Sequence, residues 1–358
     1  MPLTCTRALV LGLLGLAACE GAESGVFITD HLVIEPSGSD RMCRGTLEDM
    51  EAQTVRVAKT LGVDVPYPIQ VDYGVSAVKE HCDSSRFPVG GCANGLGEDT
   101  YINAQPSSIY HELVHAVRLV NGHKGPAFFE EGIAEVLSAF WPLFYRTEIR
   151  AAELELGPEE LAALPRSEFQ PFHYFVAGHF MSWLLRTRGE AAVAEFLNDD
   201  ELASDASAAF ARHFGLSLHD ADAAWRSSSD ERYTWGEGCD PRYALTWKGP
   251  TLEFDGKLDC RTSNTTGPIN DIMSTRVHCF TLDQPGTVRV ELIAPGGLVE
   301  FVCRGDITGS PQPYDYFRAQ QIPAGEAIEL PLEQCTWRVA VMTEVSEPGD
   351  FSLRLTRL

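Results

Sequence analysis

A short run of the chain contains the residue types of a metal site at helical spacing. Residues 108–117 read Ser-Ile-Tyr-His-Glu-Leu-Val-His-Ala-Val, which places His111, Glu112 and His115 in an apolar background. Residues four apart lie on one face of a helix, so both imidazoles can bind the same metal ion. Glu112 lies beside that face, within reach of a water molecule on the metal. The pattern predicts zinc-dependent hydrolysis.

A zinc ion in a hydrolase takes three protein ligands and leaves one position for water. The third ligand is expected from the next helix, which contains Glu130 and Glu131, and we choose Glu131. Acidic residues are also favoured in the first turn of any helix, which is the alternative explanation for this pair. Zinc lowers the pKa of its water. Glu112 would then act as the general base that takes a proton from this water and passes it to the leaving amine.

The two segments together resemble a known family of enzymes. His-Glu-x-x-His followed by Glu-Gly-x-Ala-Glu at residues 131–135 is similar to the gluzincin branch of zinc peptidases, and within it to the peptidase MA-like group. The resemblance covers roughly residues 28–230, and only the two metal-site segments are highly specific. It implies that Glu131 is the third zinc ligand and that Glu135 orients His111. A ligating histidine usually donates its other N–H to such a carboxylate.

The resemblance also implies how the transition state is stabilised. Residues 173–189 are similar to a helix of the same group with the pattern Tyr-x-x-Ala-Gly-x-Phe, usually ending near Tyr-Gly, although His179 and residues 187–188 depart from the usual small and aromatic residues. Gluzincins use a tyrosine or a histidine to stabilise the oxyanion. Tyr174 is the candidate for this catalytic role, with His173 and His179 as neighbours. The alternative is that Tyr174 is a core residue of its helix.

The aminopeptidase branch of the family carries a Gly-x-Met-Glu-Asn motif on the strand along the cleft, where the glutamate holds a free N-terminus. This chain has Gly-Cys-Ala-Asn-Gly at residues 91–95, without that glutamate. The difference favours an endopeptidase that acts on a peptide or protein substrate. A non-catalytic surface or periplasmic binding lipoprotein on the same scaffold is the alternative function. The complete ligand set together with Glu112 favours the enzyme.

The elements that must position these residues begin with a small sheet before the metal helix. Sequence patterns predict strands at residues 31–34, 68–73 and 93–103. Helical spacing predicts a helix from Thr46, as its N-cap, to Leu61. The resemblance to zinc peptidases implies that the last strand runs along the cleft, where its free edge could pair with an extended peptide or be covered.

The metal helix is expected to begin after Ser107, as N-cap, and to end at Asn121-Gly122. Helical patterns follow to residue 229, and the rest of the chain has short alternating runs between Gly and Pro turns, which predict a β-sandwich. We therefore expect the α+β class. A zincin-like metallopeptidase domain at 28–236, with a small mixed sheet and a mainly helical lower lobe, would precede an all-β sandwich domain at 237–358.

The C-terminal half loosely resembles the pre-peptidase C-terminal domains of secreted bacterial proteases. The resemblance depends on the strand pattern and on the run Thr-Trp-Arg-Val at residues 336–339. It implies a domain that binds substrate or a surface, or that is removed during maturation. A simple spacer is the alternative.

The N-terminal residues predict export. Arg7 precedes an apolar run at residues 8–18, which has the length of a signal-peptide core and is too short to span a bilayer. The run ends Leu-Ala-Ala-Cys and resembles a bacterial lipobox, with Cys19 as the lipidated first residue. We expect a lipoprotein signal peptide at 1–18, a tether at 19–27 and a lipid anchor on the periplasmic or surface face of the outer membrane. A soluble secretory signal cleaved nearby is the alternative.

Cysteine content and charge narrow the setting further. Of ten cysteines, Cys5 and Cys19 belong to the leader and the anchor, and the even remainder predicts disulfides in an exported protein. They allow about a hundred pairings. Cys82–Cys92 is expected because it closes a short loop, and at least one bridge must join the two halves if all pair. A formal net charge of −23 argues against nucleic acid or an anionic membrane surface as a partner.

Overall fold

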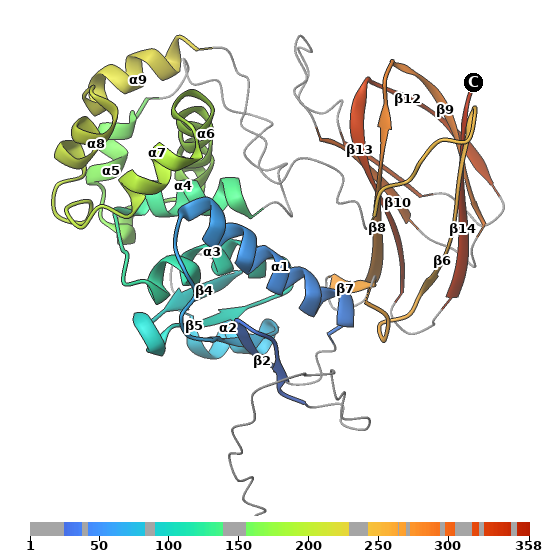
Figure 1. Ribbon diagram of the computed structural model, residues 1–358, viewed down its shortest axis with the longest axis horizontal. Helices are drawn as coiled ribbons and strands as arrows, with labels where there is room; N and C mark the ends of the chain where they lie inside the picture. The colour runs from blue at the N-terminus through green and yellow to red at the C-terminus, as the bar shows by residue number, and fades with distance from the viewer. Residues whose placement is uncertain are drawn as a thin grey trace, which may run out of the picture.

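The computed structural model describes residues 25–37, 42–82, 90–138, 155–228, 243–263, 265–269, 273–293, 298–304, 317–321, 326–344 and 349–358. The expected signal peptide at 1–18 and Cys19 lie outside these residues. The chain is of the mixed α+β class that the sequence predicts. Its buried apolar side chains form one cluster from Leu32 to Trp225 and another from Leu252 to Leu355. Figure 1 shows the first as helices around a small sheet and the second as a pair of sheets.

The N-terminal sheet is small and mixed. Its strand order is β1-β2-β3-β5-β4, in which β2, β3 and β5 run parallel while β1 and β4 pair antiparallel at the two edges. The alternation of buried residues in β2 and β3 matches the expected strands. The bounds are β1 Phe27–Ile28, β2 Leu32–Pro36, β3 Ile69–Tyr73, β4 Gly91–Asn94 and β5 Tyr101–Ala104.

The single strand expected at residues 93–103 is wrong, because the structure has two strands there. Gly95 turns the chain with φ of 84°, and the short 3-10 helix η1 (Gly97–Asp99) separates β4 from β5. A side chain at Gly95 would meet the carbonyl oxygen of Asp99 at 2.0 Å, so only glycine fits this turn. As a result β4 turns back beside β5 and becomes an edge strand of the sheet.

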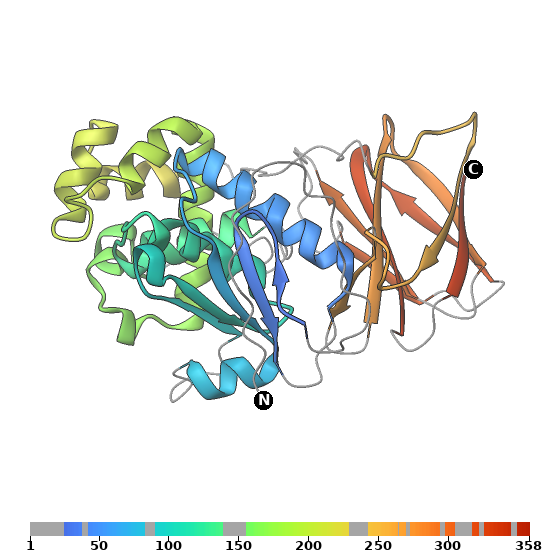
Figure 2. The same ribbon diagram turned by 60° about the horizontal axis from the view of Figure 1, so that its bottom comes forward.

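The sheet lies between α2 and a layer formed by α1 and α3 (Figure 2). Further helices form a lobe on the far side of α4. The described helices are α1 Arg44–Leu61, α2 Val75–His81, α3 Ile109–Val120, α4 Ala127–Leu137, α5 Pro158–Ala163, α6 Pro171–Arg188, α7 Glu190–Leu197, α8 Ala206–Phe214 and α9 Leu218–Arg226. The helical region expected after the metal helix is therefore present.

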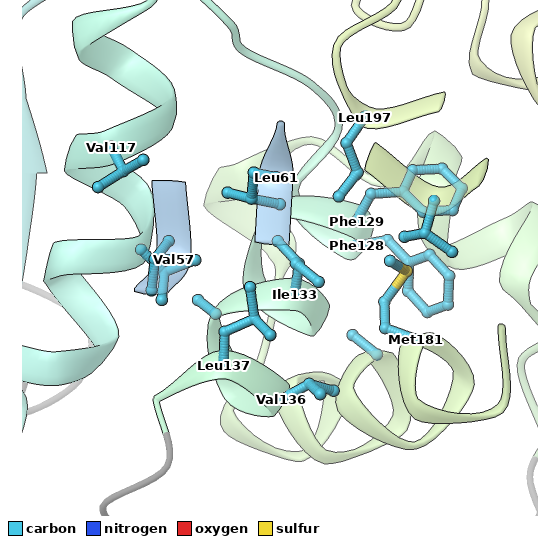
Figure 3. Close-up of a cluster of buried hydrophobic side chains, with 14 of the residues drawn as sticks. Val57, Leu61, Val117, Phe128, Phe129, Ile133, Val136, Leu137, Met181 and Leu197 are labelled. Carbon is cyan, nitrogen blue, oxygen red and sulfur yellow. The ribbon is translucent and has the colours of Figure 1, made fainter. Parts of the chain in front are cut away.

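Helix α4 is the centre of the larger core. Figure 3 shows its side chains packed among residues of α1, α3, α6 and α7. Gly132 allows α4 to approach α6 closely, because a methyl group there would lie 2.6 Å from the carbonyl oxygen of Ala177. The apolar residues drawn and labelled are Val57, Leu61, Val117, Phe128, Phe129, Ile133, Val136, Leu137, Met181 and Leu197.

The N-cap of helix α3 lies one residue later than the sequence predicts. This N-cap is Ser108, not Ser107. The Ser108 side chain accepts no hydrogen bond from the backbone N–H groups of the first turn. The hydroxyl of Ser108 donates instead to the carbonyl oxygen of Gly90, just before β4. The helix ends at Asn121-Gly122 as predicted, with Gly122 at φ of 77°. The start of the metal helix is thus bonded to the start of the edge strand.

The C-terminal region is all β in its described residues. Its sheets have the orders β11-β10-β13-β8-β7 and β12-β9-β14-β6, and all strand pairs are antiparallel. Both sheets contribute to one apolar core, which includes Phe280, Val290 and Trp337. Strands β7 and β11 were not expected from the sequence. The bounds are β6 Thr251–Leu258, β7 Thr266–Ile269, β8 Met273–Leu282, β9 Gly286–Ile293, β10 Leu298–Arg304, β11 Phe317–Gln321, β12 Ala327–Leu332, β13 Cys335–Glu344 and β14 Gly349–Arg357.

The two regions meet at the N-terminus of α1, which points at β7 (Figure 1). The free N–H groups of Arg44 and Gly45 donate to the carbonyl oxygens of Cys260 and Thr265, at 2.9 and 3.1 Å. Thr46 is not the N-cap that the sequence predicts. Its hydroxyl instead donates to the carbonyl oxygen of Gly267 and accepts from its N–H. Carbonyl groups of the sandwich therefore satisfy the helix donors that a cap would otherwise satisfy.

Disulfides reinforce this arrangement. Cys82–Cys92 forms as predicted, and Cys43–Cys260 is the expected bridge between the two halves. Cys279 and Cys335 are also disulfide-bonded. Among the residues that the structure describes, no helix has the length and apolar character needed to cross a membrane.

Candidate metal centre

Helices α3 and α4 bring three predicted ligands together. The Nε2 atoms of His111 and His115 lie 3.1 Å apart. Oε2 of Glu131 lies 3.0 Å from the first and 3.1 Å from the second. Glu131 is 2% exposed and His115 is 8% exposed. The two imidazole nitrogens and the carboxylate oxygen thus point at one buried place, and these three residues could hold a metal ion.

The donor set fits a zinc ion. Zinc bonds of about 2.0–2.1 Å in a tetrahedral arrangement place the ligand atoms about 3.3 Å apart, close to the separations seen here. Two imidazoles and one carboxylate are also a ligand set of catalytic zinc sites, which leave the fourth position open. The helical spacing explains the convergence, since His111 and His115 are one turn apart on α3.

Glu135 lies behind the first histidine. Its Oε1 is 3.3 Å from Nδ1 of His111, the ring nitrogen that faces away from Glu131. Burial opposes protonation of His111, but its hydrogen bonds with Glu131 and Glu135 raise its pKa well above the ordinary value. Glu135 thus lies one turn after Glu131 on α4, with its carboxylate at the outer ring nitrogen of His111.

Glu112 is buried beside the ligands and next to the edge strand. Its side chain packs so closely on β4 that a methyl group at Gly91 would lie 2.7 Å from its Cγ. Burial raises the pKa of the Glu112 carboxyl above its ordinary value, while the nearby histidines oppose the shift. A carboxyl group in such a place suits proton transfer.

Tyr174 is brought to the same centre, and its histidine neighbours are not. The ring centroid of Tyr174 lies 6.2 Å from that of His111. Burial and the charge of Glu131 raise the pKa of the Tyr174 phenol. His173 instead accepts a hydrogen bond from the backbone N–H of Gln170 at the start of α6. His179 accepts one from the indole N–H of Trp225 on α9.

Arg166 is a residue of the centre that the sequence reading missed. It lies in the 3-10 helix η3 (Arg166–Glu168) shortly before α6. Its Nη1 forms an ion pair with Oε1 of Glu131 at 2.7 Å, although its side chain is 61% exposed. No helical or strand periodicity marks a residue in such a turn. The closeness of the Arg166 guanidinium to Glu131 can be recognised only from the folded structure.

The acid next to Glu131 faces a different partner. Glu130 forms two hydrogen bonds with the buried guanidinium of Arg118, at 2.8 and 2.9 Å. Arg118 also donates to the carbonyl oxygen of Leu197 at the end of α7. The interaction holds the pKa of Glu130 below its ordinary value, although burial opposes this. Glu130 thus fastens α4 to α3 and takes no part in the ligand set.

Comparisons with known proteins add little to this geometry. No known protein family matches the chain, and no curated protein matches it either. Among solved structures, the chain is similar to the pre-peptidase C-terminal domain of a collagenase from Bacillus anthracis, at 11% identity, with 29% of this chain and 87% of that one covered and a TM-score of 0.21. It is also similar to PirA, at 12% identity over 30% of this chain and 93% of that one, with a TM-score of 0.18.

Proposed function

We propose that the protein is a zinc metallopeptidase of the gluzincin type with a zincin-like N-terminal domain. One observation carries the proposal: His111, His115 and Glu131 converge through single donor atoms at 3.0–3.1 Å. Glu112 lies beside this group in a buried position, as hydrolysis requires. Zinc held by the three ligands would supply an activated water and polarise the scissile carbonyl.

The side chains around the ligands have separate tasks in this mechanism. Glu112 takes a proton from the attacking water and gives it to the leaving amine. Glu135 holds the Nδ1–H of His111, which fixes the ring with Nε2 towards the ligand group. Tyr174 donates a hydrogen bond from its hydroxyl to the oxyanion that forms on the substrate carbonyl. Its ring lies beside that of His111, which supports this assignment.

The edge strand β4 provides a place for the substrate. It is the last strand of its sheet, paired only with β5 among the described strands, and its Gly91 packs against Glu112. An extended peptide that pairs with this edge would run past the general base. Residues 91–95 contain no acid to hold a free N-terminus, which favours endopeptidase action on peptides or proteins. We place the protein in the cell envelope, tethered by a lipidated Cys19.

Zinc content and cleavage by a Glu112→Gln variant test the function. The full-length protein should hold one zinc ion and cleave an unfolded protein substrate. Glu112→Gln should keep the zinc, since Glu112 is not a ligand, and should lose about 100- to 10,000-fold in rate. Glu159→Gln, an exposed acid on α5, is the matched control and should cleave normally.

Two results would contradict the proposal in different ways. Undiminished cleavage by Glu112→Gln would exclude the assigned general base. Stoichiometric zinc with no cleavage of a broad peptide library would favour the alternative, a non-catalytic binding lipoprotein on this scaffold.

A further inference from the structure

We propose that Arg166 is a positioning residue for Glu131. It holds Oε1 of this carboxylate, so that Glu131 offers only Oε2 to the metal. The inference rests on the proposed function, because it concerns the metal that this function requires. It assigns a task to a residue outside the ligand helices and outside the family motifs in the sequence.

The two oxygens of Glu131 have different partners. Oε2 lies 3.0 and 3.1 Å from the Nε2 atoms of His111 and His115. Oε1 lies 2.7 Å from Nη1 of Arg166. A guanidinium and a carboxylate at this separation form a close ion pair. With Oε1 occupied in this way, only Oε2 is directed at the place where the ligand atoms meet.

The backbone of Arg166 is fixed although its side chain is largely exposed. The carbonyl oxygen of Arg166 accepts from the N–H of Phe169, which closes the 3-10 turn. Phe169 is 6% exposed, and its ring packs at 5.4 Å from the ring of Tyr174. The turn that carries Arg166 is therefore anchored to the helix that carries Tyr174. The backbone position from which the Arg166 side chain extends towards Glu131 is therefore fixed.

The charges at the centre give a second reason for a cation there. Glu112, Glu131 and Glu135 gather around two histidines in a buried site. Arg166 lies within electrostatic range of Glu131, Glu130, Glu112 and Tyr174. Removing the guanidinium would take away the partner that fixes the orientation of Glu131 and would free Oε1. A freed Oε1 can become a second contact to the metal, which would raise the coordination number from four to five.

Metal titration of the full-length protein tests this step without measuring activity. Zn²⁺ and Co²⁺ would be bound to wild type, Arg166→Ala and Arg166→Lys in the presence of a competing chelator. Arg166→Ala should bind both metals about 10- to 100-fold more weakly, as expected when a partner of a ligand is lost. The visible absorption of the cobalt protein should also change from a four-coordinate to a five-coordinate form. Arg166→Lys keeps a cation and a donor, so it should restore most of the affinity.

Arg212→Ala is the matched control. Arg212 is also half-exposed and bonded to carboxylates, those of Asp199 and Glu201, in the helical lobe. Its loss should change neither metal affinity nor the cobalt spectrum. Should Arg166→Ala fail to fold, Arg166→Gln keeps an uncharged donor on a shorter side chain, and a weakened metal affinity is expected of it too.

The outcomes separate the inference from the proposed function. If Arg166→Ala binds both metals as wild type does, with the same cobalt spectrum, the inference is wrong while the zinc peptidase stands. If wild type binds neither metal, the proposed function fails and the inference fails with it.

Discussion

Three carboxylates surround the histidines of the centre, and each faces a different partner. Glu131 directs Oε2 at both Nε2 atoms, Glu135 faces Nδ1 of His111, and Glu112 packs against β4. In the proposed function, the same chemical group serves as ligand, as orienting partner and as proton acceptor. The difference lies in the direction in which each side chain leaves its helix, which is set by its place in the helical turn.

The buried residue His278 in the C-terminal region should make stability depend on pH. His278 on β8 donates from Nδ1 to the carbonyl oxygen of Tyr243 and accepts at Nε2 from Arg276. Burial, together with the charge of Arg276, lowers the pKa of His278 to about 4. An unfolded histidine has a pKa of about 6.5, so between these values only the unfolded chain takes up the proton.

Stability of the sandwich should therefore fall as the pH falls from 6.5 towards 4, by at most about 1.4 kcal/mol per pH unit. Thermal unfolding at pH 7, 6 and 5 measures this, and His278→Asn should flatten the dependence. An unchanged slope in His278→Asn would show that other groups are responsible.

The residues of the site could be predicted from sequence to different degrees, for physical reasons. The spacing of His111 and His115 specifies a shared helix face, so their convergence followed directly. Periodicity alone did not separate Glu131 from Glu130, and the choice needed a family resemblance. Arg166 had no signal, because a 3-10 turn has no periodic pattern and its contact with Glu131 forms only by folding.

At the scale of elements, α3 and α4 are fastened together by the buried pair of Arg118 and Glu130. We expect Glu130→Gln to lower the free energy of unfolding by about 3–5 kcal/mol, because it leaves a buried guanidinium without its counter-charge. The protein should still bind zinc, since Glu130 is not in the ligand group. Glu131→Gln should do the reverse, with zinc lost and stability of the metal-free protein less affected. Urea unfolding and metal analysis of both variants measure this.

That comparison also tests the ligand assignment. Loss of zinc in Glu130→Gln with zinc retained in Glu131→Gln would mean that the wrong member of the pair has been chosen. Arg118→Met is a second test of the contact between α3 and α4. It removes the guanidinium that binds Glu130 and leaves the ligand group unchanged.

The element order was largely predictable, and the errors occurred where local patterns were ambiguous. Sequence patterns predicted β2 and β3, and helical spacing predicted α1 as far as Leu61. The run from 93 to 103 was misread as one strand because its two glycines, Gly95 and Gly97, were not taken as breaks. Glycine inside a strand pattern usually marks such an irregularity.

At the scale of the whole molecule, the junction of the two regions depends on a glycine, Gly45. A methyl group at Gly45 would lie 2.5 Å from the carbonyl oxygen of Thr265 and 2.8 Å from that of Ser263. Gly45→Val should therefore force α1 away from the sandwich and increase protease cleavage between the regions. Val55→Leu, at an exposed site on the same helix, is the control and should leave cleavage unchanged. Equal protease resistance in Gly45→Val and wild type would contradict this account of the junction.

The junction also affects the order in which the protein can be completed during synthesis. A chain grows from its N-terminus, so α1 exists long before the carbonyl groups that bind its first N–H groups, and the disulfide Cys43–Cys260 spans 217 residues. Helix α1 in turn packs with α3 and α7 through Val57 and Leu61 (Figure 3). Helix α1, which packs against the helix of the candidate metal centre, thus receives its N-terminal partners from the last third of the chain. The start of α1 therefore stays without these partners until residues 260–267 have been made, and a chain that stops before them lacks the groups that bind it.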